Sequence, residues 1–193
     1  MNRAEKRQLL ISWRPSVKEM SATVNDSCYA LDELPMITIE YLADYPEFLP
    51  MLAEWQHGEW GHIRPGDTVE ARMARLQAAM GRDRIPLTVV ALAKEKLVGS
   101  ASLIRHDMDT RLELTPWLAG VFVAPEYRRQ GIGAQLVRRI MAQAGKLNVS
   151  VLYLYTVHSE LFYSSLGWSL LEHTAYRKQR ITIMTYQLTH ESH

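Results

Sequence analysis

The most informative part of the sequence is Val121-Phe-Val-Ala-Pro-Glu-Tyr-Arg-Arg-Gln-Gly-Ile-Gly-Ala134. It predicts the end of a strand, a turn that carries two arginines, and a helix that opens at two glycines. The free N–H groups and the dipole of a helix N-terminus favour an anion, and glycine lets a phosphate approach the backbone closely. The stretch therefore predicts a phosphate-binding turn. The alternative interpretation is an ordinary turn between strand and helix, in which glycine permits the backbone conformation and the arginines lie on the surface.

Two familiar phosphate-binding loops do not fit this stretch. A P-loop ends in Gly-Lys-Ser/Thr, and that run is missing from the sequence. A dinucleotide-binding turn needs a small residue three positions after its second glycine, where Leu136 stands. An ATP-dependent or other nucleotide enzyme is also disfavoured, because the lysine and the acidic metal ligands that it would need are not found.

Hydrophobic periodicity and turn residues predict the other elements. Helices are expected over 45–58, with Pro46 in the first turn and Gly58 as the stop, and from an Asp67 N-cap to Gly81. The remaining expected elements are strands at 36–41, 87–93, 97–104, 117–123, 151–157, 168–175 and 181–188, and helices at 131–144 and 159–166. Mixed runs of this kind predict an α+β or α/β layered sheet with helices on its faces.

The length of 193 residues suits one domain with a good core and an appendage. The first residues carry scattered charges, a Trp13-Arg14-Pro15 break and a polar run from Ser21 to Ser27. We therefore expect 1–35 to be an N-terminal extension and 36–193 to form one domain, with Met36 as an alternative start site.

Composition excludes several classes of partner. The 22 Lys and Arg against 21 Asp and Glu give a net charge of +1, so a general nucleic-acid binder is not expected. The only cysteine, Cys28, excludes an internal disulfide and a multi-cysteine metal site. His57 and His62 are five residues apart, off the helical spacing of a metal pair, so no metal is expected. No apolar run approaches the roughly 20 residues of a membrane helix, and a cytoplasmic protein without a membrane partner is the expectation.

Two linked motifs now identify a resemblance. The run Arg128-x-x-Gly131-x-Gly133 resembles the acyl-CoA loop of the Gcn5-related N-acetyltransferase (GNAT) family, whose pattern is Gln/Arg-x-x-Gly-x-Gly/Ala. The run of residues that leads into this loop, from Val123 to Arg129, is also typical of that family. Further on, Leu161-Phe-Tyr-Ser-Ser-Leu-Gly-Trp168 resembles the family's second signature. The order of elements agrees from about Met36 to Leu188, so 36–193 is expected to be an N-acetyltransferase domain.

The resemblance implies an acyl-CoA N-acyltransferase type of fold: a mixed, mostly antiparallel central sheet with a splayed parallel strand pair and about four helices. Pantetheine would insert between the splayed strands, and the glycine turn would hold the pyrophosphate. The cofactor-binding residues that it implies are Phe122, Val123, Arg128, Arg129, Gln130, Gly131, Ile132, Gly133, Ala134 and His158. The chain departs from the family in one respect. Many members have an Asn early in the second motif, where this chain has Thr156-Val-His158-Ser-Glu160, so His158 or Ser159 would make that contact.

The family's chemistry needs few groups, because an amine attacks the thioester directly. A base must deprotonate the ammonium, and an acid should protonate the leaving thiolate. The resemblance places Tyr163 near the coenzyme sulfur as that general acid, and the alternative interpretation is an aromatic side chain that packs the short helix. Glu113, just before the central strand, is the candidate base.

The acceptor side offers further groups of undecided role. The first helix and the loop after it commonly cover the acceptor in this family. The ionisable residues there are Glu54, His57, Glu59 and His62, for each of which a solvated surface group is the favoured interpretation and a catalytic base the alternative. Trp55, Trp60 and Trp117 could line an acceptor pocket or pack in the core.

The sequence thus predicts an acetyl-CoA-dependent acetyltransferase that modifies a primary amine on a small molecule or peptide. The alternative is a non-catalytic acyl-CoA-binding or protein-interaction module on the same fold. A homodimer would be in keeping with the family.

Overall fold

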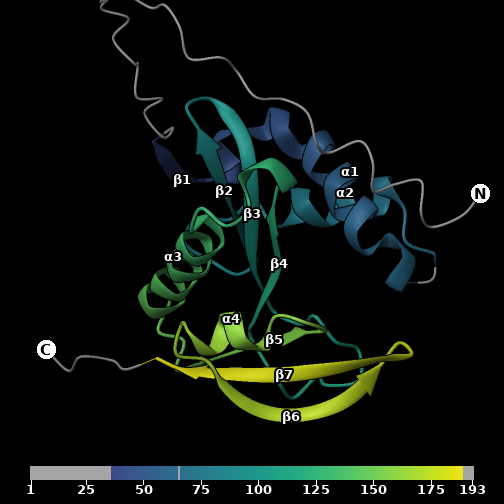
Figure 1. Ribbon diagram of the computed structural model, residues 1–193. Helices are drawn as coiled ribbons and strands as arrows, with labels where there is room; N and C mark the ends of the chain where they lie inside the picture. The colour runs from purple at the N-terminus through teal and green to yellow at the C-terminus, as the bar shows by residue number, and fades with distance from the viewer. Residues whose placement is uncertain (1–35, 65, 189–193) are drawn as a thin grey trace, which may run out of the picture. The chain divides into compact units, whose positions relative to one another are not determined.

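A computed structural model describes residues 36–64 and 66–188. The expected extension over 1–35 lies outside the described residues. In Figure 1 the described part is a twisted sheet with helices on both of its faces. None of the helices in this described part has the length and apolar character needed to cross a membrane.

The sheet has seven strands in the order β1-β2-β3-β4-β5-β7-β6. Their bounds are β1 Ile37–Tyr41, β2 Leu87–Ala93, β3 Lys96–Ile104, β4 Trp117–Val123, β5 Val151–Thr156, β6 Ser169–Tyr176 and β7 Gln179–Gln187. Neighbouring strands are antiparallel except for the pair β4 and β5, which is parallel. The expected mixed, mostly antiparallel sheet with one parallel pair is therefore confirmed.

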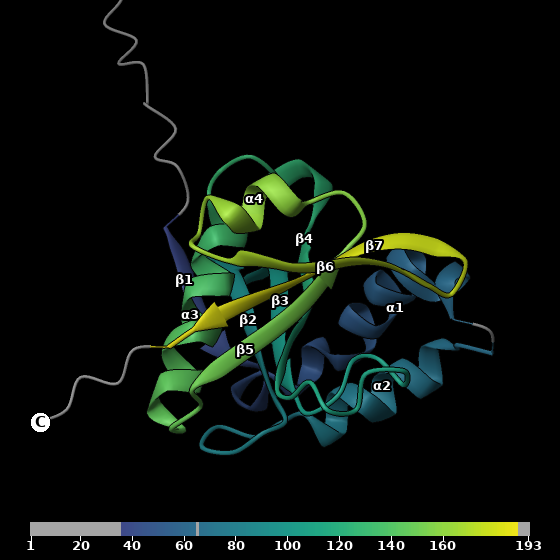
Figure 2. The ribbon, with the colours of Figure 1, turned by 90° about the horizontal axis from the view of Figure 1, so that it is seen from below.

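Apolar side chains of β2 point alternately to the two faces of the sheet, which explains why helices cover both of these faces. Leu87, Val89 and Ala91 belong to a buried cluster with α3 (Ile132–Lys146), whereas Val90 and Leu92 belong to a cluster with α1 (Leu49–Trp60) and α2 (Val69–Ala78). Successive side chains of a strand point to opposite faces of the sheet, so a strand that is apolar throughout must be covered on both faces. Figures 1 and 2 show α3 on one side of β1–β4 and the α1–α2 pair on the other.

The first helix differs from the prediction at both ends. Two 3₁₀ turns, Leu42–Asp44 and Pro46–Phe48, precede α1, which continues past Gly58 to Trp60. Pro46 begins the second of these turns, and Pro50 lies in the first turn of α1, where a missing N–H leaves no helical hydrogen bond unmade. The expected single helix over 45–58 was therefore wrong in its start and its stop.

The cap of α2 is also not the residue expected. Thr68, rather than Asp67, occupies the N-cap, and its Oγ1 accepts a hydrogen bond of 3.1 Å from the Ala71 N–H. The helix ends at Ala78, before Gly81. Because Thr68 caps the helix, the carboxylate of Asp67 is available to the side chains of α2.

The parallel pair separates soon after it forms. Its one register pair joins Trp117 to Tyr153, whose N–H donates to the Pro116 carbonyl over 3.1 Å. Beyond that point β4 carries a bulge, where Gly120 adopts a φ of +60° that a side chain would disfavour. The expected splay is confirmed, and it leaves the end of β4 without a strand partner on the β5 side.

Candidate functional site

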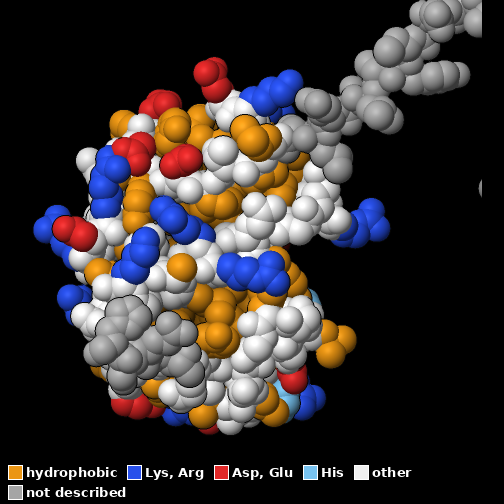
Figure 3. Space-filling view, turned by 90° about the vertical axis from the view of Figure 1, so that its left-hand side faces the viewer, with side chains coloured by type: hydrophobic (Ala, Val, Ile, Leu, Met, Phe, Trp, Pro, Cys, Tyr) orange, Lys and Arg blue, Asp and Glu red, His pale blue; other side chains and the backbone are white. Residues whose placement is uncertain are grey.

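A cavity of about 810 Å³ opens where β4 and β5 separate. Gly120 and Val121 of β4 and Tyr155 and Thr156 of β5 line it, together with residues from α1, α2, the β3–β4 loop and the β6–β7 turn. Figure 3 shows the surface notched between the part that holds β1–β4 and the part that holds β5–β7, with apolar side chains inside the notch and Lys or Arg beside it. The fold thus builds a deep site at the one place where its sheet is incomplete.

Tyr163 comes from α4 (Glu160–Ser164) and lines this cavity. Its ring packs edge-on against Phe162 and Trp168, with centroid distances of 5.0 and 6.2 Å. Burial raises the pKa of its hydroxyl to about 12, so the group stays protonated at neutral pH. Tyr163 therefore serves packing and also brings a proton donor to the cavity wall.

The glycine turn lies at the start of α3, as the sequence predicts. Gly131 is the N-cap with a φ of +78°, and no side chain caps the helix. The first N–H groups of α3 have no partner within the helix and are available to a ligand. Gly133, in contrast, has an ordinary helical backbone, and a Cβ there would lie 3.5 Å from the Phe162 ring. The left-handed conformation therefore belongs to Gly131, while Gly133 leaves the first turn of α3 without a side chain beside Phe162.

Arg128 is held against β4 instead of extending freely from the turn. Its Nε donates a hydrogen bond of 2.9 Å to the Val123 carbonyl, and its guanidinium lies 5.8 Å from the Phe122 ring centroid. An Nη atom lies 3.5 Å from a carboxylate oxygen of Glu59 in α1. Arg129 is exposed at a φ of +62°. The two arginines therefore differ: Arg128 fixes the turn to β4, and Arg129 faces solvent.

The other residues expected around the coenzyme lie on both sides of the splay. Phe122 is buried, Val123 is half-buried beside Gly133, and Gln130 is exposed with its amide 3.4 Å from the Glu126 carbonyl. Ile132 is buried in the core beneath α3, which leaves only its backbone N–H for a ligand. Ala134 is half-buried in the first turn of α3. His158 is exposed on the opposite side and lines the cavity.

The three tryptophans have different positions. Trp60 lines the cavity, and Trp55 packs against Phe122 with their ring centroids 5.3 Å apart. Trp117 is fully buried, and its indole N–H donates to the Leu114 carbonyl over 2.6 Å. Of the three, only Trp60 is in a position to contact an acceptor.

The acidic and basic candidates divide in the same way. Glu59 and His62 line the cavity, whereas Glu54 and His57 do not. Glu113 is exposed on the β3–β4 loop and is not part of the cavity wall. A carboxylate that does line the cavity comes from the same loop, six positions earlier, and sequence reasoning passed over it: Asp107.

Asp107 combines burial with a cationic surrounding. Burial raises the pKa of its carboxyl to about 6, although Arg64, Arg177, Arg72 and Arg75 each act to lower it. The carboxyl is therefore largely ionised at pH 7 yet close enough to its titration point to exchange a proton readily.

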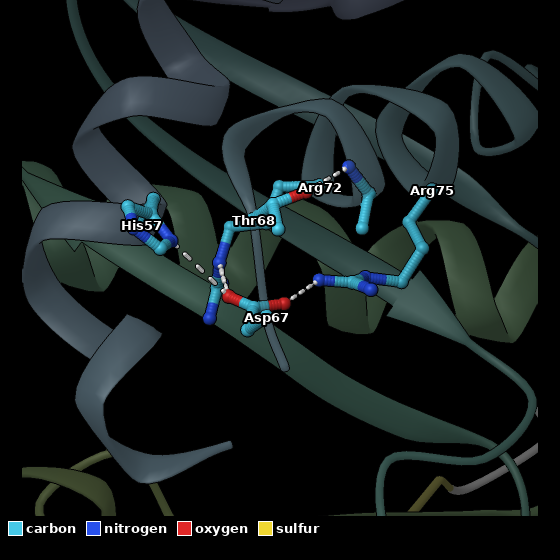
Figure 4. Close-up of polar contacts among 6 residues, drawn as sticks. His57, Asp67, Thr68, Arg72 and Arg75 are labelled. Carbon is cyan, nitrogen blue, oxygen red and sulfur yellow. Dashed lines mark hydrogen bonds and ion pairs between the residues drawn. The ribbon is translucent and has the colours of Figure 1, made fainter. Parts of the chain in front are cut away.

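A buried carboxylate organises the helical side of the cavity (Figure 4). The Asp67 side chain is fully buried, accepts hydrogen bonds from Arg72 and Arg75, and lies 3.5 Å from the Nδ1 atom of His57. Burial alone would raise the pKa of Asp67, but the hydrogen bonds from the two arginines bring it below its ordinary value. Asp67 thereby holds Arg72 and Arg75 at the cavity wall.

One amide in the wall lacks a partner. Gln56 of α1 is buried, its Nε2 has no hydrogen-bond acceptor among the described residues, and it lies close to Gly120. A side chain at Gly120 would come within 3.3 Å of this Nε2 atom. The absence of a side chain there leaves the amide room beside the bulge of β4.

The described residues contain no cluster of three His, Cys, Asp or Glu side chains arranged to hold a metal ion. The cavity wall carries two carboxylates, three imidazoles, two phenols, the amide of Gln56 and a group of arginines; the first three sets are Glu59 and Asp107, His62, His106 and His158, and Tyr155 and Tyr163.

Comparison with known proteins agrees with this geometry. Residues 86–170 match the model of the acetyltransferase (GNAT) domain, a span that holds β2–β5, α3, α4 and the glycine turn. No curated protein sequence is significantly similar to the chain.

Solved structures share the fold. A putative acetyltransferase from Exiguobacterium sp. 255-15 is 27% identical, covers 79% of this chain and 93% of its own, and has a TM-score of 0.56. An acetyltransferase from Streptococcus agalactiae is 20% identical over 79% of this chain and 98% of its own, with a TM-score of 0.60. A putative acetyltransferase from Salmonella typhimurium, solved with its cofactor acetyl-CoA, is 17% identical over 82% and 97%, with a TM-score of 0.58.

Proposed function

We propose that the chain, a member of the GNAT family whose acetyltransferase domain model matches residues 86–170, transfers the acetyl group of acetyl-CoA to a primary amine bound in the cavity. The observation that carries the proposal is the position of the cavity, which joins the gap between β4 and β5 to a wall with both a carboxylate and a neutral phenol. A donor placed in the gap would present its thioester to an amine placed in the cavity.

The coenzyme would be held by backbone groups more than by side chains. The free N–H groups at the start of α3 suit its pyrophosphate, with Arg129 adding charge from the turn. The unpaired edge of β4 near Phe122 and Val123 suits the amide groups of pantetheine, and His158 lies across the gap. A metal has no step in this reaction, since the thioester is already activated.

Transfer then proceeds by direct attack. The amine nitrogen forms a bond to the thioester carbon, the bond from that carbon to sulfur breaks, and the sulfur leaves as a thiolate. Before attack the ammonium gives one proton to Asp107, directly or through a water, which later releases it to solvent. As the adduct collapses, the Tyr163 hydroxyl gives a proton to the thiolate, and the second proton lost by the nitrogen returns to the tyrosinate. Glu113 remains the competing candidate for the base, although its exposed position would require a longer proton relay.

The phosphate turn gives a first prediction. Gly133→Val should weaken acetyl-CoA binding at least about tenfold. The space at Gly133 admits a Cβ, with Phe162 at 3.5 Å and Val123 at 3.8 Å, so the two extra methyl groups must project toward the first turn's ligand side or displace these neighbours. Calorimetric titration with acetyl-CoA measures the effect.

The matched control is Gly145→Val, the same change near the other end of α3, where a Cβ meets nothing within 4 Å. Both variants change the helix propensity by the same amount, a gain because Val is a better helix former than Gly, so any difference in their affinity for acetyl-CoA arises from the turn. If both bind acetyl-CoA like the wild type, the turn does not hold the coenzyme.

Release of CoA in the presence of amines tests the proposed function. The protein is mixed with acetyl-CoA and a panel of small amines, amino acids and peptides, and free thiol is followed with time. Amine-dependent release with formation of the N-acetyl product is expected. Binding of acetyl-CoA without amine-dependent release for any member of the panel would favour the non-catalytic module instead.

A further inference from the structure

The wall of the cavity carries more cationic than anionic side chains. Its charged residues are Arg64, Arg72, Arg75, Arg105 and Arg177 against Glu59 and Asp107. Arginine stays charged at every working pH, so the positive charge of these arginines is present at every such pH. The chain as a whole is nearly neutral at +1, which makes the cavity a local concentration of positive charge.

Two of these arginines, Arg72 and Arg177, are built into the wall. The side chain of Arg72 is only 11% exposed, lies over the Trp60 ring at 5.9 Å and is fixed by the fully buried Asp67. Arg177 is 18% exposed and is held by Asp109 at 3.0 Å. Ordering long cationic side chains costs conformational entropy, and grouping them costs repulsion, so the arrangement is stable only with anionic partners.

The protein supplies only part of that anionic charge. Asp67 holds Arg72 and Arg75, but the guanidinium groups of Arg64 and of the exposed Arg105 have no ion pair or hydrogen bond with any described residue. Arg64 is half-buried and close enough to Arg72 to lower its pKa, an effect that adds to the larger one of burial. The wall therefore has unused hydrogen-bond donors of fixed positive charge.

We propose that the acceptor amine carries an oxyanion, a carboxylate or a phosphate, which Arg64 and Arg105 bind with help from Arg72 and Arg75. Planar guanidinium groups pair with either oxyanion through two hydrogen bonds. The ammonium of the same molecule then faces Asp107, which lies among these arginines. The acceptor is thus a zwitterion, bound at one end by arginines and at the other by a carboxylate. This inference rests on the proposed acetyl transfer and names its substrate class.

The phosphates of the coenzyme are not an equivalent explanation for this charge. None of the residues 128–134 that form the glycine turn lines the cavity, whereas all of the arginines above do. The turn has its own helix N-terminus and its own Arg129 for a pyrophosphate. The arginine wall therefore faces the acceptor side.

Matched amines of similar size test the proposal. The kcat/KM values are compared for phosphoethanolamine and β-alanine, which carry the two oxyanions, for neutral ethanolamine and for cationic putrescine. At least one anionic amine should exceed ethanolamine by about tenfold or more, as expected for a charge-assisted pair in a partly buried site. The better of the two anionic amines identifies the oxyanion.

Arg64→Gln should remove this preference, so that the ratio of kcat/KM for the anionic amine to kcat/KM for ethanolamine falls about tenfold. The ratio is the readout because Arg64 also lowers the pKa of Asp107, and its loss therefore affects the rates with both amines alike. This arginine is chosen because its loss leaves no carboxylate unpaired, and Arg105→Gln is the second variant. Arg138→Gln, exposed on α3, is the control and should change neither substrate.

A second readout does not depend on turnover. Protein saturated with CoA cannot transfer acetyl, and calorimetry should show that it binds the preferred anionic amine more tightly than ethanolamine, with the difference lost in Arg64→Gln. Acetylation with ethanolamine or putrescine preferred would overturn the inference and leave the proposed function standing. Arg64-dependent binding without any amine turnover would overturn the proposed function, and equal binding of all four amines would overturn the inference.

Discussion

Asp107→Asn should lower the rate of acetyl transfer about a hundred- to ten-thousandfold, the usual loss when a general base is removed. The carboxylate is the ionisable acid that the β3–β4 loop places in the cavity wall, and Asn keeps its shape without its basicity. In the wild type, burial raises the pKa of Asp107 to about 6, so kcat/KM should rise with pH through that value and then level off. The variant should lose that ascending limb.

Stability separates this role from a structural one. Since the folded protein raises the pKa of Asp107 from 3.8, it favours the neutral acid, and the associated stability is present at low pH and lost as pH rises through about 6. Asn is neutral at every pH, so the variant's melting temperature above pH 6 should equal or exceed that of the wild type. A lower melting temperature with a parallel loss of activity would indicate a structural carboxylate.

Glu113→Gln is the matched control for the base. It removes an exposed carboxylate from the same loop and should leave the rate and its pH profile unchanged. If Glu113→Gln loses the ascending limb while Asp107→Asn keeps it, the base is Glu113.

Tyr163→Phe should lower turnover about ten- to a thousandfold with little change in acetyl-CoA affinity. The contacts of the ring with Phe162 and Trp168 survive in Phe, and no described residue forms a hydrogen bond with the lost hydroxyl. The loss should fall on kcat, because the thiolate gains its charge only as the tetrahedral adduct collapses. Single-turnover measurement prevents slow product release from masking the effect.

Tyr186→Phe provides the comparison for this prediction. Tyr186 packs against Trp168 from outside the cavity, with ring centroids 5.7 Å apart, so its hydroxyl has no part in transfer. Wild-type single-turnover rates in both variants would make Tyr163 a packing residue only.

Local sequence signals predicted most of the fold. The hairpin of β2 and β3, the strand β4 and the glycine turn are each encoded by a contiguous run of residues, and all appear where expected. The errors fall at helix ends, where several residues compete for one role. Asp67 and Thr68 are both good N-caps, and the outcome depends on Arg72 and Arg75, which bind Asp67 from within the helix.

The acceptor side of the site could not be predicted in the same way. Three separate parts of the sequence supply Asp107, Arg177 and the pair of Arg64 and Arg72, and these parts meet only around the cavity. None of them stands in a motif, and the raised pKa of Asp107 arises from burial that tertiary structure creates. The one local signal was the pairing of Arg72 with Arg75 one helical turn apart, which reads equally well as a solvated helix face.

Acetyl transfer is tested most directly by following the acetyl group itself. The complex with acetyl-CoA is preformed, phosphoethanolamine, β-alanine or another amine of the panel is added, and the reaction is quenched within one turnover. Mass spectrometry then counts CoA and N-acetyl product together. We expect equal amounts of the two, formed at a rate that Asp107→Asn and Tyr163→Phe each reduce. Bound acetyl-CoA that stays intact with every amine, or CoA released without an acetylated amine, would contradict it.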